Sequence, residues 1–551
     1  MHRMHRRVLA VCCVVIALAG FAAGADRAKP SSAPADVVHE RDTPLTRVAF
    51  GSCSRPTLPQ RLWKPLGELE PEVFAWLGDV VYADSREQTF VWRPSPLEHV
   101  RDIYAMQKAL PEYKAFVDGP SKPLVLGVWD DHDFNLNNGG DRNQLRDSVQ
   151  EIFLDFLDEP AESLRRQREG LYVSHAWSGP DRKGRIRRVK LILLDVRYFR
   201  QDFDSDTDSK WAMWISSLTA GQPVNVNFPG VGDEQVVRHE ELRHKQHRDH
   251  SRGDMLGDAQ WTWLEAQLRD SAEQQFDLTL IGSGVQVLSD TPIIEKWGLF
   301  GSSQRRLLKT VHDLGVPGVV FLSGDVHMGE MLCTDDTEDY LLGLSYQSAH
   351  STPVPAQRPH HLPDDSPITV NTVPRLGYPL FEFTSSGMTH SCKTQIPIVS
   401  CLFAVNWLAP GTFRVGPTIF DDLNFGFIEI DWDNEVVEAS IRGKDGAAGL
   451  VTKIPFSRLR PFQQSDKETA SASELQYEAH LCPHRHPVDD VHLWARFGVR
   501  VVLISALLVL VLGVPLLCLS LPFLLLRCVW RWRFRAASTS ASSQPRHAKS
   551  E

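Results

Sequence analysis

The chain has 551 residues, of which 42% are hydrophobic and 23% are charged. This composition is that of a globular protein with enough apolar material for one large or two modest cores. The formal net charge is −10, and no basic stripe of the kind that binds nucleic acid runs along the sequence. The composition therefore argues against a nucleic-acid partner, and an anionic ligand would need metal ions or local arginines to offset the acidic charge.

The first 25 residues indicate a secretory signal peptide. Arginines precede an apolar stretch at residues 8–21, and the small residues 23–25 provide a cleavage site. An uncleaved anchor is the alternative, but a short apolar stretch that ends in small residues favours cleavage. Residues 26–43 are polar and rich in Pro, Ser and Ala, so they are predicted to form a linker.

Five short apolar runs in the main part of the chain each end in a cluster of polar residues. The runs cover residues 48–50, 73–77, 124–129, 191–194 and 319–323. Runs of this kind are typical of buried parallel strands whose carboxyl ends open into one crevice. A core strand has no structural need for Asp, His, Tyr or Cys at its exit. The clusters therefore predict a polynuclear metal site.

The second and third runs lead to carboxylates, a phenol and an imidazole. Asp79 can bridge two cations with its two oxygens, and Tyr82 could supply a phenolate; the alternative is that Tyr82 is an ordinary half-buried tyrosine. In the third cluster Asp131 can ligate a metal ion, His132 can protonate a leaving oxygen, and Asp133 can orient the imidazole. A solvated turn is the alternative for this cluster.

The last two runs add arginines, a carboxylate and an imidazole. Arg197 and Arg200 follow the fourth run, where they could clamp a phosphoryl group in bidentate fashion. The alternative is that both are surface arginines. Asp325 and His327 lie two residues apart after the fifth run, so both can hold cations on one side of a turn.

Amphipathic helices are predicted between the strands. Apolar residues share one helical face over residues 145–157, 261–268 and 307–314. For the last of these helices, Ser303 is the expected N-cap and Gly315 the expected stop.

An antiparallel hairpin is predicted near the end of the main domain. Residues 425–432 and 436–441 alternate between apolar and polar around an Asp-Asn turn. The long polar segments 201–257 and 345–375 are interpreted as surface insertions that shape a substrate mouth.

The C-terminal part of the sequence indicates a membrane anchor. Residues 501–526 contain no charge and are numerous enough to cross a bilayer of about 30 Å. The excess of arginines after this stretch places its C-terminal side in the cytosol. We therefore expect a juxtamembrane stalk at 461–495, a transmembrane helix at 496–527 and a cytosolic tail at 528–551. The protein would then be a single-pass type I membrane protein whose main domain is extracellular or luminal.

Five cysteines lie between the predicted signal peptide and the predicted span, an odd number for an oxidising compartment. If Cys53 is a metal ligand, four remain for two disulfides. Cys392 with Cys401 is the local pair that we expect, and Cys333 with Cys482 follows by elimination. A single unpaired structural thiol is the alternative.

Taken together, the clusters resemble a known enzyme family. They are Phe50-Gly51-Ser52-Cys53, Gly78-Asp79-x-x-Tyr82-Ala83-Asp84, Trp129-Asp130-Asp131-His132-Asp133, Leu194-Asp195-x-Arg197, Ser323-Gly324-Asp325-Val326-His327 and Thr384-Ser385-Ser386-Gly387-x-Thr389-His390. In this order, over residues 48–454, they resemble the PhoD-like alkaline phosphatase family of the calcineurin-like metallophosphoesterases. The chain departs from the family after Asp133, where relatives often read Tyr/Phe-Gly-x-Asn-Asp and this chain has an Asn in the last position.

The resemblance implies a fold, cofactors and a ligand set. The fold is an α/β four-layer metallophosphoesterase sandwich, expected here over residues 44–460. The cofactors are a trivalent iron held by Cys53, Asp79 and Tyr82, and calcium beside it, although other divalent metals would also suit. The full set of implied metal ligands is Cys53, Asp79, Tyr82, Asp131, Asp325 and His327. His132 corresponds to the catalytic histidine of the superfamily.

We therefore expect a membrane-anchored, metal-dependent phosphatase that hydrolyses small-molecule or lipid-headgroup phosphate esters by attack of a metal-bound hydroxide. His132 would assist the leaving group, and Arg197 would stabilise the phosphoryl oxygens. One alternative is a phosphodiesterase or phospholipase-like enzyme acting on lipid headgroups. The other is a catalytically silent surface-binding protein with the same fold, against which the retained His132 and ligand set argue.

Overall fold

The computed structural model describes residues 35–88, 91–201, 253–291, 294–334, 378–395, 401–403, 405, 414–415, 419–460, 490–513, 520–522 and 525–531. The predicted signal peptide, most of the predicted insertion 201–257, all of the predicted insertion 345–375 and most of the predicted stalk lie outside these residues.

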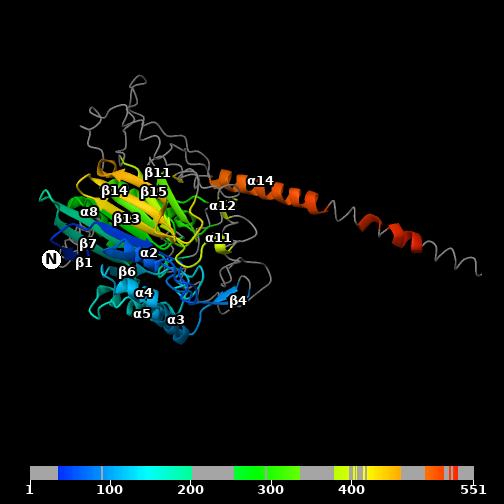
Figure 1. Ribbon diagram of the computed structural model, residues 1–551, viewed down its shortest axis with the longest axis horizontal. Helices are drawn as coiled ribbons and strands as arrows, with labels where there is room; N and C mark the ends of the chain where they lie inside the picture. The colour runs from blue at the N-terminus through cyan, green and yellow to red at the C-terminus, as the bar shows by residue number, and fades with distance from the viewer. Residues whose placement is uncertain are drawn as a thin grey trace, which may run out of the picture.

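Two mixed β-sheets form the centre of the molecule (Figure 1). The seven-stranded sheet has the order β1 (Val37–Glu40), β7 (Val173–Pro180), β8 (Ile186–Leu193), β9 (Leu278–Ser283), β10 (Val319–Ser323), β12 (Leu380–Ser385) and β11 (Gly329–Thr334). The six-stranded sheet has the order β15 (Ala448–Pro455), β14 (Val436–Arg442), β13 (Phe425–Asp431), β2 (Arg47–Gly51), β3 (Val73–Leu77) and β6 (Leu124–Val128). A small hairpin pairs β4 (Ser85–Gln88) with β5 (Val91–Arg93). The predicted mixed α/β architecture is confirmed.

Helices pack on the outer faces of both sheets. The helices of the main body are α2 (Trp63–Glu68), α3 (Leu97–Ala109), α4 (Pro111–Val117), α5 (Arg146–Phe156), α8 (Gly257–Glu273) and α9 (Gly301–Leu314), with short turns α11 (Cys392–Gln395) and α12 (Cys401–Phe403). On the six-stranded sheet, Trp63 of α2 contacts Phe74 of β3, the ring centroids being 5.5 Å apart. On the seven-stranded sheet, the buried Lys190 of β8 pairs with Asp270 of α8 at 2.6 Å.

The two sheets pack face to face, and one hydrophobic cluster contains core residues of both. Gly282 in β9 shows how closely they approach, because a Cβ atom there would lie 2.8 Å from Leu77 Cδ2 in β3. Strands β2, β3 and β6 run parallel in one sheet, and β8, β9 and β10 run parallel in the other. All five predicted apolar runs contribute to these strands, and β3 and β10 have the predicted bounds.

The remaining local predictions have mixed outcomes. The hairpin of β13 and β14 is antiparallel as predicted, and Gly315 ends α9 in the left-handed conformation. The predicted N-cap at Ser303 is wrong: the N-cap of α9 is Phe300, three residues earlier, and the Ser303 hydroxyl bonds to Asp254 at 3.1 Å. The hydroxyl binds Asp254, a residue outside the helix, and does not cap the N-terminus of α9.

The predicted local disulfide is present, since Cys392 and Cys401 are bonded. Cys53 is a free, buried thiol, as its predicted ligand role requires. Cys333 is disulfide-bonded as well, but its predicted partner Cys482 lies outside the described residues, so that pairing stays a prediction.

Across the described ranges, the helices are each too short or too polar to qualify as a bilayer-crossing segment. The predicted transmembrane helix at 496–527 falls partly on α14 (Asp490–Leu508) and partly outside the described residues.

Candidate metal centre

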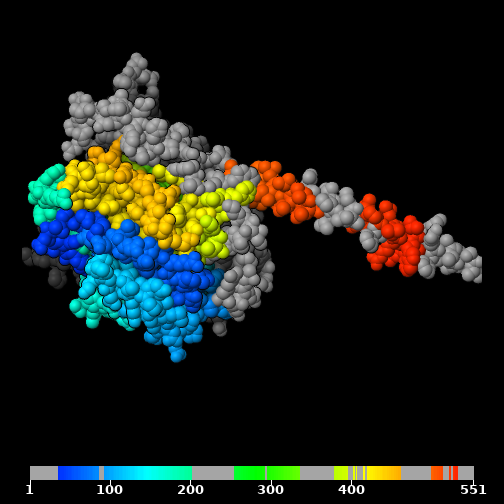
Figure 2. Space-filling model, in the orientation of Figure 1, coloured from blue at the N-terminus to red at the C-terminus, as the bar shows by residue number. Residues whose placement is uncertain are grey.

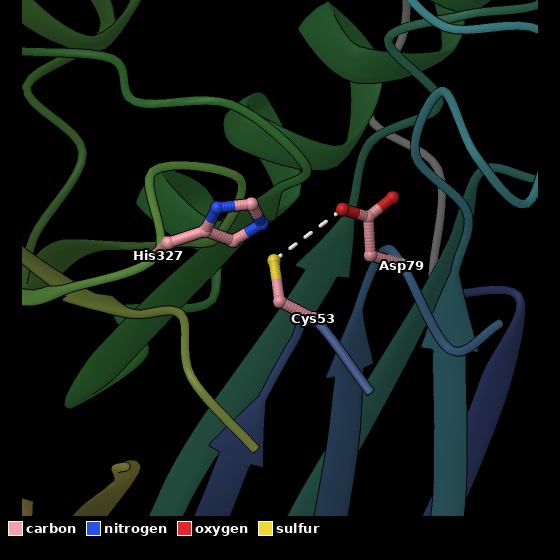
Figure 3. Close-up of side chains that lie close together, drawn as sticks. All are labelled: Cys53, Asp79 and His327. Atoms are coloured by element: carbon pink, nitrogen blue, oxygen red, sulfur yellow. Dashed lines mark hydrogen bonds between the residues drawn. The ribbon is translucent and has the colours of Figure 1, made fainter. Parts of the chain in front are cut away.

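Cys53, Asp79 and His327 meet at the carboxyl ends of strands from both sheets. They follow β2, β3 and β10, respectively. Their ligand atoms all lie within 4.8 Å of one another, and Cys53 Sγ lies 3.3 Å from Asp79 Oδ2. Figure 3 shows the thiol and the carboxylate directed into the same space, with the imidazole of His327 approaching it from the opposite side. A thiol, a carboxylate and an imidazole at this spacing can share one cation.

Two further ligand groups extend this cluster. Asp79, Asp131 and His132 form one of them, and Asp130, Asp131 and Asp325 form the other, again with ligand atoms within 4.8 Å. Asp79 and Asp131 each belong to two of the three groups, so the groups are contiguous. Carboxylates shared in this way can bridge neighbouring cations, which is what a site with more than one metal ion requires.

The backbone of the candidate ligands is strained. The left-handed conformation is adopted by Cys53 (φ 60°), Asp79 (φ 50°), Asp325 (φ 71°) and His327 (φ 56°). For residues with a Cβ atom this region costs on the order of 1–3 kcal/mol each, and such strain concentrates at functional sites. Gly78 completes the turn after β3, because a Cβ atom at this position would lie 2.3 Å from Asp130 Cβ.

Buried carboxylate oxygens without hydrogen bonds make the site suitable for cations. Asp79 Oδ1, Asp130 Oδ2 and Asp131 Oδ1 are buried and have no hydrogen-bond partner within the described part of the chain. Burial raises the pKa of both Asp79 and Asp325 well above the usual range, and Asp130 and Asp131 add to both shifts. Since unpaired buried carboxylates are costly and metal coordination satisfies them, the residues present fit a metal centre.

Tyr82 lies against the first ligand group. Its hydroxyl donates to Asp79 Oδ2 at 3.2 Å and lies 2.9 Å from His327 Nε2. Burial raises the pKa of Tyr82 well above its usual value, and the nearby Asp79 and Cys53 act in the same direction. A cation would therefore have to stabilise the phenolate that the predicted ligand role requires.

Asp84 orients His132, whereas Asp133 was predicted to do so. His132 Nδ1 lies 2.8 Å from Asp84 Oδ1, and Asp84 Oδ2 accepts a hydrogen bond from the backbone N–H of Asn137 at 2.8 Å. Asp133 instead accepts hydrogen bonds from two backbone N–H groups of the turn after β3 and from the Tyr104 hydroxyl. Those buried N–H groups need an acceptor, which is why Asp133 points toward them and away from the imidazole.

The environment of His132 favours its protonated form. Burial alone would lower its pKa, but the charges of Asp131, Asp84 and Asp79 outweigh burial and raise the pKa to about 10. The imidazole also packs against the Tyr82 ring, with centroids 4.0 Å apart. A protonated, held imidazole beside a metal centre is suited to donate a proton to a leaving oxygen.

Comparison with known proteins identifies the family. A family model described as PhoD-like phosphatase matches residues 49–383, which is more than half of the chain and lies within the predicted domain 44–460. The chain belongs to the PhoD-like phosphatase family. It is therefore a hydrolase that acts on phosphoric ester bonds, as the sequence predicted, and a metal-dependent one.

Two further comparisons set this PhoD-like phosphatase against solved structures and against curated proteins. A solved structure titled "Structure of PhoD" is similar at 13% sequence identity and a TM-score of 0.42, covering 80% of this chain and 76% of that chain. No curated protein matches the chain.

Arg197 and Arg200 are buried in this PhoD-like phosphatase, so the alternative that they are surface arginines is wrong. Arg197 donates from Nε to Asp130 and from Nη1 to Glu295 at 3.1 Å. Arg200 pairs with Glu295 at 2.9 Å and donates to the carbonyl of Asn138 at 2.9 Å. The predicted phosphoryl clamp stays a prediction, and two of the three guanidinium nitrogens of Arg197 are already bound to carboxylates.

His390 is a candidate ligand to which the sequence analysis gave no role. Its Nε2 lies 2.8 Å from the Tyr82 hydroxyl. Burial lowers its pKa to about 2, and the charges of His327 and Arg55 contribute, so the imidazole is neutral and able to bind a metal ion. Its presence in the family-like motif Thr384–His390 was the available signal. That motif begins in the last two residues of β12, the neighbour of β10, and its remaining residues follow the strand, which explains why it reaches the same centre.

Ser386 is a second residue whose role was missed. Its hydroxyl lies 3.0 Å from Cys53 Sγ and accepts a hydrogen bond from the backbone N–H of His327 at 2.7 Å. It therefore fixes two candidate ligands from different sheets relative to one another. A hydrogen bond from Ser386 to the sulfur would also favour the thiolate, against the effect of burial, which raises the pKa of Cys53.

Proposed function

We propose that this chain is a metal-dependent phosphatase that hydrolyses phosphate esters at a centre held by the groups Cys53, Asp79, His327 and Asp130, Asp131, Asp325, with His132 as the proton donor to the leaving oxygen and not as a ligand. The observation that carries the proposal is the pairing of His132 with Asp84 directly beside the shared carboxylates Asp79 and Asp131. A binding protein with the same fold would need neither the imidazole nor its carboxylate partner.

The predicted ligands divide into two kinds of donor. The thiol of Cys53, the phenol of Tyr82 and the carboxylate of Asp79 suit a trivalent iron, and the oxygen-rich group of Asp130, Asp131 and Asp325 suits calcium or another hard divalent ion. These metal identities rest on the family resemblance and on donor chemistry. When bound, such ions lower the pKa of a coordinated water and polarise phosphoryl oxygens.

The protein's own residues supply orientation and a proton. Because Asp84 occupies Nδ1 of His132, the other ring nitrogen, Nε2, is left for the ester oxygen. The Tyr82 ring and the half-buried Trp92, whose centroid lies 4.9 Å from that of His132, pack against the imidazole and restrict its rotation. A leaving alkoxide would then take the proton from Nε2, while the hydrogen bond between Nδ1 and Asp84 keeps the ring in place.

The activity test uses the purified chain loaded with metal and p-nitrophenyl phosphate as substrate. We expect phosphate release that a chelator abolishes and that His132→Ala lowers by about 10²–10⁴-fold. His99→Ala, at an exposed position on α3, is the matched control and should leave the rate unchanged. Absence of turnover in the metal-loaded wild type would contradict the proposal. Faster turnover of the bis-ester would favour the phosphodiesterase alternative.

We also propose that the domain is tethered to a membrane as a type I protein. The support is the uncharged stretch 501–526 and the exposure of its apolar side chains, such as Val502 at 66% and Leu507 at 61%. Helix α14 projects away from the main body in Figure 1, and Figure 2 shows the same projection in space-filling form. Phase partition in detergent tests the tether: the full chain should enter the detergent phase and a chain ending at Arg460 should not.

A further inference from the structure

Arg55 is held rigidly at the edge of the metal centre, two residues after Cys53. Its backbone N–H donates to the Thr389 hydroxyl at 2.8 Å, and its carbonyl accepts hydrogen bonds from Gln60 Nε2 and from the backbone N–H of Leu58, both at 3.0 Å. The loop after β2 is thus attached to the loop after β12. These hydrogen bonds fix the position of the Arg55 backbone, from which its side chain extends.

The side chain of Arg55 lies over Tyr82. The centre of its guanidinium group is 4.1 Å from the centroid of the Tyr82 ring, whose hydroxyl contacts Asp79 and His327. The charge of Arg55 acts on the centre, because it opposes the burial that raises the pKa of Tyr82 and adds to the effects that lower the pKa of His390. The guanidinium group therefore packs against one candidate ligand, whose hydroxyl contacts two others.

Arg55 differs from the other arginines near the centre because no carboxylate of the described residues neutralises it. Arg197 and Arg200 share Glu295, and Arg197 also binds Asp130. Arg55 forms no ion pair with any described residue, and its Nε atom is buried without a hydrogen-bond partner. A half-buried guanidinium group with an unsatisfied N–H beside an acidic centre is a binding position for an anion.

We propose that Arg55 is the residue that binds the phosphoryl oxygens of the substrate, and that it selects dianionic phosphate monoesters over monoanionic diesters. This inference rests on the proposed phosphatase function. A guanidinium group binds two phosphoryl oxygens through paired N–H donors. Its Coulomb attraction to a dianion is about twice that to a monoanion at the same distance. Arg197, in contrast, acts as a positioning residue that fixes Asp130.

The alternative role for Arg55 is purely structural, as a cation–π contact that supports Tyr82. Two substitutions separate the roles. Arg55→Met keeps an unbranched side chain over the ring and removes the charge, whereas Arg55→Lys keeps the charge and loses the paired donors. Arg61→Met, at an exposed position in the same loop, is the matched control. Metal content is measured for each protein, so that loss of the centre is not mistaken for loss of substrate binding.

The first readout is binding of inorganic phosphate to the metal-loaded chain by calorimetry, which requires no turnover. We expect Arg55→Met to weaken phosphate binding about 10- to 100-fold, Arg55→Lys to weaken it less, and Arg61→Met to leave it unchanged. Unchanged phosphate affinity in Arg55→Met with full metal content would overturn the proposal. So would a loss of affinity that only follows a loss of metal.

The second readout compares kcat/KM for p-nitrophenyl phosphate and bis(p-nitrophenyl) phosphate. Arg55→Met should reduce the value for the monoester at least about threefold more than that for the diester, mainly through KM. Equal losses for both substrates would overturn the claim of selectivity. An inactive wild type would instead count against the phosphatase function, so the two failures are distinguishable.

Discussion

His132 Nδ1 and Asp84 Oδ1 lie 2.8 Å apart, although 48 residues separate them in the sequence. The pair joins the turn after β6 to the segment that follows the turn after β3. The second oxygen of Asp84 accepts a hydrogen bond from the backbone N–H of Asn137, so the carboxylate is held from both sides. The carboxylate therefore fixes the ring and helps to keep it protonated.

Replacement of Asp84 should change the pH dependence of the reaction. In Asp84→Asn the imidazole loses the negative charge of its own hydrogen-bond partner, which is one of the charges that raise its pKa. If His132 acts as the proton donor, the rate declines as pH rises through its pKa, so the alkaline limb of the kcat profile should shift to lower pH. We expect kcat at alkaline pH to decrease about 10- to 100-fold.

Asp133→Asn is the matched control for that experiment. Asp133 accepts hydrogen bonds from backbone groups and from Tyr104, and it makes none to His132. Its replacement should lower the melting temperature, because a buried carboxylate that accepts several hydrogen bonds is lost, and leave the alkaline limb in place. A shift of the limb in Asp133→Asn, or none in Asp84→Asn, would refute the assigned pairing.

Replacement of Cys53 should lower the metal content. Cys53→Ser removes the thiol from the first ligand group and leaves Asp79 and His327. We expect at least one metal ion per chain to be lost or weakly held, measured by elemental analysis after extensive dialysis. Cys528→Ser replaces an exposed free thiol and should keep the wild-type metal content. Equal metal content in both variants would show that Cys53 is no ligand.

The metal-stripped protein should become less stable as pH rises. The folded-state pKa values of Asp79 and Asp325 are raised above the ordinary value of 3.8, and that of His132 is raised from 6.5 to about 10. The folded state therefore binds more protons than the unfolded chain at neutral pH, and stability decreases with pH. Melting temperatures from pH 5 to 8 after chelation should fall.

Metal loading should reverse that trend, because the ligands bind cations only after losing their protons. Asp325→Asn removes one of the groups with a raised pKa, so the stripped variant should show a shallower decrease than the stripped wild type. A melting temperature of the stripped wild type that rises across this range would contradict the assigned electrostatics.

Loss of the Cys392–Cys401 disulfide should loosen the metal centre. The backbone N–H of Cys392 donates to the carbonyl of His327 at 2.7 Å, so one hydrogen bond links the disulfide to a candidate ligand. Replacing both cysteines by serine should cost about 2–3 kcal/mol of unfolding free energy and should speed metal loss to a chelator. Wild-type rates of metal loss in the double variant would show that the disulfide supports only the surrounding loop.

Arg197→Met should destabilise the fold. The change leaves the buried Asp130 without its cation, whereas Glu295 keeps its ion pair with Arg200, and breaking a buried ion pair from one side costs about 3–5 kcal/mol. Denaturant unfolding measures this loss. Arg197→Met combined with Asp130→Asn should recover part of the stability, because the uncompensated charge is removed. Full stability of the single variant, with weaker phosphate binding, would instead support the predicted phosphoryl clamp.

The sequence by itself determined the strands and the candidate ligands that follow them. Both are local features: an apolar run predicts a buried strand, and polar residues directly after it must leave the core at the carboxyl end. That is why Cys53, Asp79, Asp131 and His327 could be predicted as neighbours. The disulfide between Cys392 and Cys401 was predictable for the same reason, since only nine positions separate its ends.

Tertiary structure decided which side chains pair around those ligands. Asp84 and Asp133 are both carboxylates near His132, and no sequence pattern tells which one faces the imidazole. Arg197 contacts Glu295, which lies 98 positions away in the sequence, so this ion pair could not be predicted from the residues around Arg197. Arg55, by contrast, has no such partner among the residues that the structure describes. Hydrogen bonds and ion pairs depend on the positions of the polar side-chain atoms to within a few tenths of an ångström, and only the packing of the two sheets sets those positions.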